Sequence, residues 1–172
     1  MQRKTKAVVE SALYPPFLKK LEQLVVNCEA RGMQYWATSG FRSWKEQDAL
    51  YALGRTVKNV DANAARPMGG TVTKAKGGQS YHNMSTACDF ALDADQTRAG
   101  LQPDWNRESY RILAEEAKKL GLDAGFWWTG FPDAPHVQLD ITKAGLNLAS
   151  MQALYKKGGI PAIWAELDKH SW

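Results

Sequence analysis

The sequence has little of what marks several protein classes. Its 172 residues include only two cysteines, Cys28 and Cys88, which is too few for a disulfide framework. No apolar run approaches the length of a membrane span. The basic segment at residues 1–16 lacks the apolar stretch of a signal peptide, and no Lys/Arg tract or nucleic-acid reader motif is present. We therefore expect no disulfide scaffold, no membrane span and no nucleic-acid partner.

The composition is that of a globular domain. Hydrophobic residues make up 44% of the chain, enough for a single core. The net charge of +4 favours an anionic partner, and the anionic cell envelope is one candidate. No internal repeat, low-complexity tract or linker divides the sequence, and no dimer face is evident. We expect one domain over residues 1–172 and a monomer, with closing helices at about 143–172 packed on the rest.

Apolar spacing and turn residues predict interspersed helices and strands. Helices are expected over residues 15–31, 43–54, 105–121, 144–159 and 161–170, and strands over 33–41, 87–92 and 136–141. Ser43 and Glu46 form a capping-box pattern. Residues 55–79 have little periodicity and predict a long loop, which in a compact domain is often functional. There are too few helical crossovers for a parallel sheet, so the expected class is α+β.

Two predicted strands carry polar side chains on one face. Because side chains alternate along a strand, Asp89 shares its face with two alanines, while the other face is apolar. His136 and Gln138 likewise share one face of the later strand. If the two strands belong to one sheet, Asp89 and His136 can point into the same cleft. His82, in the loop before the first strand, can then reach over its end.

A carboxylate beside two imidazoles suggests a metal site. Burial of these groups needs compensation, which a divalent cation provides. Zn²⁺ accepts nitrogen and oxygen ligands, and three protein ligands leave one position for water, so His82, Asp89 and His136 match a catalytic zinc pattern. Cys28 and Cys88 fall on apolar faces and do not join the set. Ordinary hydrogen-bonded polar residues remain the alternative explanation for the same pattern.

Three motifs in order resemble one known family. Residues 80–89 carry Ser, His, Ala and Asp at the spacing of the signature SxHxxGxAxD, residues 133–136 read Asp-Ala-Pro-His, and residues 39–56 resemble the stretch upstream of both. The chain is similar to the zinc peptidases of bacteriophage endolysins that act as L-alanyl-D-glutamate endopeptidases. These are relatives of the D-Ala-D-Ala carboxypeptidases and of the Hedgehog-type domain. The similarity covers roughly residues 36–140.

The resemblance implies a fold and a set of roles. The fold is a small antiparallel sheet with flanking helices, as in Hedgehog and DD-peptidase domains. His82, Asp89 and His136 would hold one Zn²⁺ per chain, which supplies Lewis acidity for attack of water on an amide. Asp133 would take the proton of the water and later deliver it to the leaving amine.

Other candidate roles are less determined. Arg42 suits a developing oxyanion or a substrate carboxylate, because its donors form a fork, but a structural salt bridge is an equal alternative. Ser80 is a candidate for substrate binding and can also be a plain loop hydroxyl. Gln138 is a further substrate-binding candidate and stands where relatives often have an acidic residue. Ser85 replaces the glycine of the signature, so that loop must fold without the conformational freedom of glycine.

The implied function is hydrolysis of the L-Ala–D-Glu bond in peptidoglycan stem peptides during host cell lysis. Without a signal peptide, such an endolysin would stay in the host cytoplasm until a holin opens the way to the periplasm and cell wall. The alternatives are a D,D-carboxypeptidase or dipeptidase acting on D-Ala-D-Ala ends, a non-catalytic zinc-bearing wall-binding module, and a cysteine peptidase. Asp133 argues against the module, and neither cysteine suits a nucleophile. The closing helices are expected to be packing, not a separate wall-binding domain.

Overall fold

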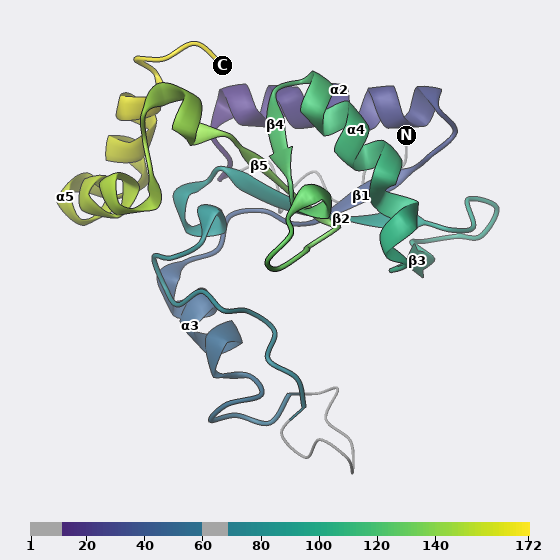
Figure 1. The fold of residues 1–172 in the computed structure, drawn as a ribbon, viewed down its shortest axis with the longest axis horizontal. Helices are drawn as coiled ribbons and strands as arrows, with labels where there is room; N and C mark the ends of the chain where they lie inside the picture. Colours follow the sequence, from purple (N-terminus) through teal and green to yellow (C-terminus); the bar gives the residue numbers. More distant parts are fainter. Residues whose placement is uncertain (1–11, 60–68) are drawn as a thin grey trace.

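A computed structural model describes residues 12–59 and 69–172 (Figure 1). Two segments lie outside the described residues. They are residues 1–11, which make up most of the basic N-terminal segment, and residues 60–68, in the middle of the predicted loop. Across the described ranges, no helix is both long enough and apolar enough to cross a membrane.

The described elements alternate between short strands and helices. The α-helices are α2 (Pro15–Ala30), α3 (Trp44–Ala52), α4 (Arg111–Lys119) and α5 (Leu148–Leu167). The strands are β1 (Tyr35–Ser39), β2 (Ala87–Asp93), β3 (Pro103–Asp104), β4 (Leu122–Ala124) and β5 (His136–Leu139). Short 3₁₀ helices are η1 (Tyr81–Met84), η2 (Arg107–Tyr110), η3 (Gly125–Trp127) and η4 (Ile141–Ala144).

The strands form one antiparallel sheet. Their order is β1-β2-β5-β4, and β3 pairs with the end of β2. In the register of β2 with β5, Asp89 lies opposite His136 and Ala87 opposite Gln138. The expected α+β class, with a small antiparallel sheet and flanking helices, is therefore confirmed. The two strands with polar faces are direct neighbours in one sheet, which is the condition under which Asp89 and His136 were expected to share a cleft.

The core lies between the sheet and the helix pair α2 and α4, which contact each other (Figure 1). Cys88 and Phe90 of β2 are fully buried against Phe17 and Leu24 of α2 and Leu113 of α4. The apolar face predicted for β2 is thus the core face. Asp89, which points the opposite way, keeps a side-chain exposure of 25%.

Local sequence signals explain where most helices begin and end. Ser43 caps α3 with its side chain accepting from the Glu46 N–H, and Glu46 accepts from the Ser43 N–H at 2.8 Å, the predicted capping box. Gly158 and Gly159 break α5 with non-helical backbone angles, which corresponds to the two predicted closing helices. The helix predicted over 105–121 is instead the 3₁₀ turn η2 followed by α4.

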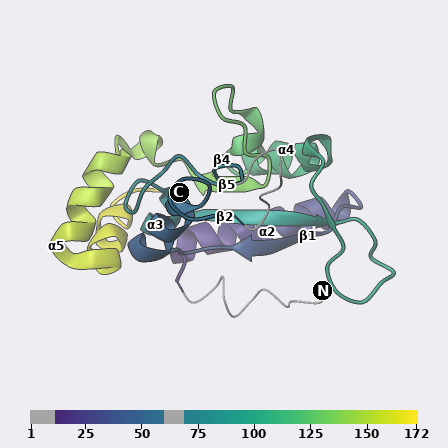
Figure 2. The same cartoon turned by 90° about the horizontal axis from the view of Figure 1, so that it is seen from below.

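The broken helix α5 lies at one end of the molecule in both views (Figures 1 and 2). It contacts the segment that leads into the polar cleft. The Tyr155 ring stacks on Trp44 of α3 with centroids 4.7 Å apart. The Gln152 side chain donates to the Gly78 carbonyl at 2.7 Å. Through these contacts α5 supports both α3 and the loop that precedes Ser80.

Candidate metal centre and active site

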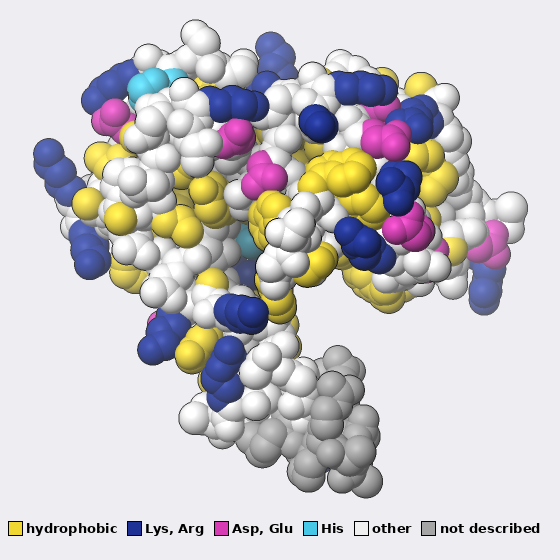
Figure 3. Space-filling view, viewed as in Figure 1, with side chains coloured by type: hydrophobic (Ala, Val, Ile, Leu, Met, Phe, Trp, Pro, Cys, Tyr) yellow, Lys and Arg dark blue, Asp and Glu magenta, His cyan; other side chains and the backbone are white. Residues whose placement is uncertain are grey.

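A cleft of about 480 Å³ opens on the face of the sheet that carries Asp89. Its walls come from β1, from residues 72–82, and from the segment between η3 and β5. In the space-filling view, a histidine side chain is visible at the bottom of a hollow near the middle of the molecule (Figure 3). The predicted site residues Arg42, Ser80, Asp133 and Gln138 line the cleft together with the three predicted ligands.

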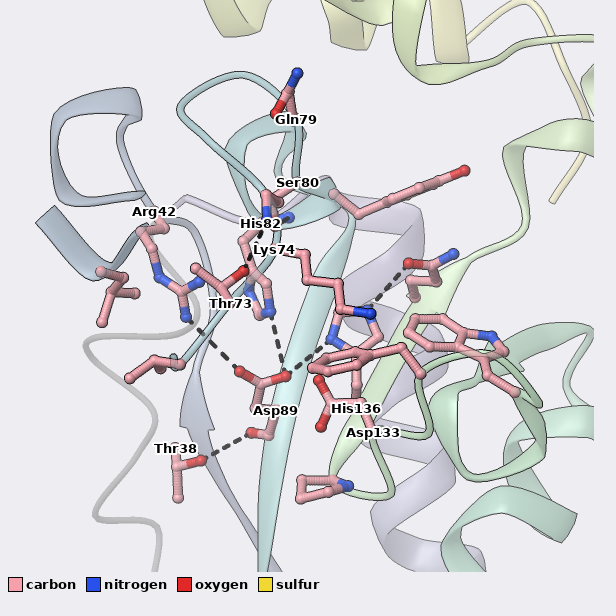
Figure 4. Close-up of a pocket in the computed structure, with 18 of the residues that line it drawn as sticks. Thr38, Arg42, Thr73, Lys74, Gln79, Ser80, His82, Asp89, Asp133 and His136 are labelled. Carbon is pink, nitrogen blue, oxygen red and sulfur yellow. Dashed lines mark hydrogen bonds and ion pairs between the residues drawn. The ribbon is translucent and has the colours of Figure 1, made fainter. Parts of the chain in front are cut away.

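His82, Asp89 and His136 meet at the floor of this cleft (Figure 4). Each offers one ligand atom, and the three atoms lie within 4.8 Å of one another. The Asp89 Oδ1 atom is 3.2 Å from His82 Nε2 and 2.9 Å from His136 Nδ1. The fold therefore brings the distant His136 to His82 and Asp89, which are close in sequence, as the motifs predicted.

The hydrogen bond made by His82 Nδ1 determines which nitrogen of the ring can bind a metal. Nδ1 lies 2.7 Å from the Gly40 carbonyl, inside the protein. A carbonyl oxygen only accepts, so Nδ1 carries the proton. Nε2 then presents its lone pair to Asp89.

His136 is oriented by a longer hydrogen-bond chain. The Trp128 indole N–H donates to Asp123 at 3.0 Å, and the Gln138 amide donates to the other oxygen of the same carboxylate at 2.9 Å. With its NH₂ on Asp123, Gln138 turns its carbonyl oxygen toward His136 Nε2, 3.0 Å away. Nε2 is therefore the donor, and Nδ1 presents its lone pair to Asp89. We call Trp128, Asp123 and Gln138 the outer chain.

His82 Nε2, His136 Nδ1 and Asp89 Oδ1 thus converge, and none of the three atoms carries a proton. Two imidazole nitrogens lie 3.2 and 2.9 Å from the same carboxylate oxygen, and their lone pairs repel that oxygen unless a cation lies among them. This set fits Zn²⁺, which takes N and O ligands and can keep a further position open. The outer chain is the kind of second layer that orients metal-binding histidines. The residues present therefore fit a divalent metal.

A proton takes the place of the cation when no metal is bound. Burial opposes the charged form of His136, but the hydrogen bond and charge of Asp89 outweigh it and raise the pKa of His136 above its usual value. Burial also opposes ionisation of Asp89, yet hydrogen bonds from His136 and His82 hold its pKa well below the usual range. Metal and proton therefore compete for the same place.

Asp133 lies beside the three ligand residues, on the turn that leads into β5. Its N–H donates to the Gly125 carbonyl at 3.0 Å, and its own carbonyl accepts from the His136 N–H at 3.0 Å. A side chain at Gly125 would overlap the Asp133 carbonyl, so only glycine allows this close approach. Burial raises the pKa of Asp133 above its usual value, although the charge of His136 opposes the shift. A carboxylate with raised proton affinity suits a group that both takes and returns a proton.

Arg42 is held rigidly at the edge of the cleft. Its guanidinium donates to Gln47 at 2.8 Å and to Ser39 at 2.9 Å, and it lies 3.7 Å from the second oxygen of Asp89. The structural ion pair predicted as one alternative is present, and Arg42 also lines the cleft, while its role toward an oxyanion or a substrate carboxylate stays a prediction. Gln47, which is completely buried, donates in turn to the Ala75 carbonyl at 2.9 Å.

Residues 10–138 match the model of the VanY family, described as D-alanyl-D-alanine carboxypeptidase. The chain belongs to this family. It is 37% identical over 139 residues to the peptidoglycan L-alanyl-D-glutamate endopeptidase CwlK of Bacillus subtilis, covering 76% of this chain and 75% of that protein. It is 26% identical to the L-alanyl-D-glutamate peptidase of Listeria phage A118, covering 80% of this chain and 45% of that protein.

A solved structure of a VanY D,D-pentapeptidase mutant in complex with Zn(II) shares the fold, with 20% identity, a TM-score of 0.52, and coverage of 79% of this chain and 81% of that one. The VanY-family membership confirms the resemblance found in the motifs. The protein is a metallopeptidase-family enzyme, with a His-Asp-His cluster that can hold a metal.

Two residues of this VanY-family chain stand at the positions where its motifs depart from the signature. Ser85 adopts a left-handed backbone angle, φ 64°, and its buried hydroxyl has no partner among the described residues. Gln138 joins the outer chain through both ends of its amide. The Ser80 hydroxyl accepts from the His82 N–H at 3.3 Å and caps η1. The substrate-binding roles predicted for Ser80 and Gln138 stay predictions.

Sequence reasoning missed two residues that shape the site. Asp123 is on β4, and its place beside Gln138 follows from the register of β4 with β5. Gln47 follows the capping box of α3, and its side chain points back to Arg42. The Glu-Gln pair in the upstream motif was the available signal for Gln47. For Asp123 the available signal was the run at residues 120–128, which resembles the family's segment before the second histidine.

Proposed function

We propose that the protein is a zinc-dependent peptidoglycan endopeptidase that hydrolyses the L-Ala–D-Glu bond of stem peptides. The observation that carries the proposal is the convergence of three oriented lone-pair donors beside the half-buried carboxylate of Asp133. The likeness to the Bacillus subtilis endopeptidase, over three quarters of both chains, supports this choice of bond. One zinc ion per chain and a monomeric state belong to the same proposal. Native mass spectrometry counts both.

The residues of the cleft divide the work of amide hydrolysis. A bound zinc ion would supply the Lewis acidity that makes water a nucleophile and polarises the scissile carbonyl. Asp133 takes the proton of the attacking water and returns it to the amine that leaves. Its raised proton affinity brings it closer to the neutral range in which both transfers are efficient.

Arg42 stabilises the charge that develops on the carbonyl oxygen. Its guanidinium is already fixed by Gln47 and Ser39, so little reorganisation is needed when the negative charge appears. Asp89 shares its second oxygen with Arg42 at 3.7 Å, which ties the guanidinium to the metal centre.

A D,D-carboxypeptidase is the second candidate, because the family model carries that description. Digestion of purified peptidoglycan, followed by mass spectrometry of the new ends, distinguishes the two. A new D-Glu amino terminus supports the endopeptidase, whereas released D-Ala supports the carboxypeptidase. A wall-binding module without catalysis would release neither.

Two controls tie the cleavage to this site. Activity lost in a chelator and restored by zinc identifies the metal requirement. Asp133→Asn keeps the shape of the side chain and removes its basicity, so it should abolish cleavage while zinc binding remains. Wall digestion by the Asp133→Asn protein at the wild-type rate would contradict the proposed mechanism.

We also propose that the enzyme acts as an endolysin, waiting in the host cytoplasm and reaching the periplasm and wall through a holin. The support is the likeness to the peptidase of a Listeria phage. Expression in bacteria with and without a co-expressed holin tests it. Lysis only in the presence of the holin is the expected result, and lysis without it would contradict this route.

A further inference from the structure

The cleft is lined by two cationic side chains, Arg42 and Lys74. Arg42 is engaged by Ser39, Gln47 and the carboxylate of Asp89. Lys74 is different, because among the described residues no carboxylate lies within ion-pair distance of its ammonium. It is the lining cation that remains available to a ligand.

Lys74 reaches across the cleft from the loop that precedes Ser80. Its side chain points toward the side of Asp133 and His136 (Figure 4). The ammonium lies 4.7 Å from the centre of the Phe131 ring, which belongs to the opposite wall and is 46% exposed. A cation over an exposed ring is held weakly. A carboxylate can therefore take the place of the ring as its partner, since charge-assisted contacts are stronger.

The charges of the cleft call for such a cation if the substrate is an anion. Asp133 lines the cleft and repels a carboxylate that enters beside it, whereas the charge of Asp89 would be offset by the bound metal. Arg42 is partly neutralised by Asp89 at 3.7 Å. Lys74 is then the group that offsets this repulsion on the Asp133 side.

The proposed substrate carries a carboxylate next to the bond that breaks. In a stem peptide the D-Glu residue continues through its side-chain carboxyl, so its α-carboxylate is free, one carbon away from the scissile nitrogen. We propose that Lys74 binds this α-carboxylate and makes the enzyme prefer free D-Glu over the amidated residue, D-isoglutamine. The inference rests on the proposed function and names the part of the substrate that the cleft recognises.

The contact is made before and during the reaction alike. The carboxylate does not change its charge when the amide is cleaved, so Lys74 contributes equally to substrate and transition-state binding. Removal of Lys74 should therefore raise KM and leave kcat almost unchanged. This pattern distinguishes Lys74 from Asp133, whose loss acts on kcat.

The experiment compares two matched peptides, one with L-Ala–D-Glu and one with L-Ala–D-isoglutamine, on the zinc-loaded enzyme. The wild type should prefer the free acid by about tenfold in kcat/KM, the scale of one charged hydrogen bond in a partly open site. Lys74→Met should lose this preference by slowing the acid alone, and Lys74→Arg should keep most of it. Added salt should weaken the preference of the wild type.

Lys76 provides the matched control. It lies two residues further along the same loop, with its ammonium 5.3 Å from the centre of the Tyr51 ring, and it does not line the cleft. Lys76→Met removes the same charge and should leave both substrates unaffected. Equal slowing of both peptides by Lys74→Met, or a lost preference in Lys76→Met, would overturn the assignment.

A second measurement separates this inference from the proposed function. Calorimetric binding of the two peptides to the Asp133→Asn protein, and to the same protein with Lys74→Met added, reports the preference without turnover. If the wild type cuts neither peptide, the proposed function fails, and the binding data still decide on Lys74. Equal affinity of the Asp133→Asn protein for both peptides would refute the role of Lys74 even if cleavage occurs at the expected bond.

Discussion

Asp123 should control zinc affinity without touching the metal. In the wild type, Trp128 and Gln138 each donate to one oxygen of the Asp123 carboxylate. In Asp123→Asn only one oxygen is left to accept from these two donors. The amide of Gln138 can regain a partner by turning over, which points its NH₂ at His136 Nε2. That arrangement moves the ring proton of His136 to Nδ1, the atom that faces Asp89. The lone pair needed by the metal is then lost.

The size of the effect follows from what is removed. Loss of one outer partner of a metal-binding histidine typically costs 10–100-fold in affinity, which is about 1.4–2.8 kcal/mol. Because the substitution also favours the wrong ring tautomer, we expect the upper end, roughly 100-fold. Competition with a fluorescent zinc chelator at neutral pH measures it. Asp140→Asn is the control, since it removes the same charge from a residue that caps η4 outside the cleft.

A double variant tests the donor-to-acceptor order of the hydrogen bonds in the outer chain. Asp123→Asn combined with Gln138→Glu moves the carboxylate next to His136, where it can accept from Nε2 while the introduced asparagine donates to it. Most of the lost affinity should return. If Asp123→Asn binds zinc as tightly as the wild type and Asp140→Asn do, the reasoning about the outer chain is wrong.

Three further predictions concern stability and catalysis. Ser85→Gly should raise the free energy of unfolding by about 0.5–1 kcal/mol, because glycine accepts φ 64° without strain and leaves no unpartnered buried hydroxyl; a lower melting temperature than the wild type would contradict this. The zinc-free protein should be most stable between about pH 4 and 6.5. Because folding lowers the pKa of Asp89, this residue stabilises the fold at pH values above the ordinary aspartate pKa, and the contribution is lost on acidification. Because folding raises the pKa of His136, this residue stabilises the fold at pH values below the ordinary histidine pKa, and the contribution is lost as the pH rises through the folded pKa. The melting temperature gained on adding zinc should therefore grow from pH 6 to 8, and a gain that is flat across this range would refute the competition between metal and proton. Gly125→Ala should displace Asp133 and lower kcat by about 10–100-fold with zinc affinity kept, so a parallel loss of zinc binding would show that the turn supports the ligands as well.

The motifs predicted more of the site than of the fold around it. Asp89 and His136 come together because β2 and β5 are neighbours in register, and alternation along each strand already placed these two side chains on one face. His82 in η1 and Asp133 on the turn before β5 reach the same place because each precedes one of these strands. Periodic apolar residues likewise predicted α2 and the core face of β2.

The remaining features depend on long-range pairing that a single sequence does not encode locally. β3 and β4 contain two and three residues, too few for a period to appear. Asp123 acquires its role only through the register of β4 with β5. The start of the helix predicted at 105 was displaced because Asn106 caps a 3₁₀ turn first, with its side chain accepting from the Glu108 N–H.

The stacking of Tyr155 on Trp44 has a practical consequence for anyone who wishes to shorten or recombine this enzyme. The family match stops at residue 138, yet the helix beyond it braces α3 and, through Gln152, the backbone at Gly78. A fragment that ends at residue 138 would retain every candidate ligand. It would lose α5, the helix that supports the wall of the cleft with Lys74. We therefore expect the smallest active fragment to extend past residue 138, where the family match ends.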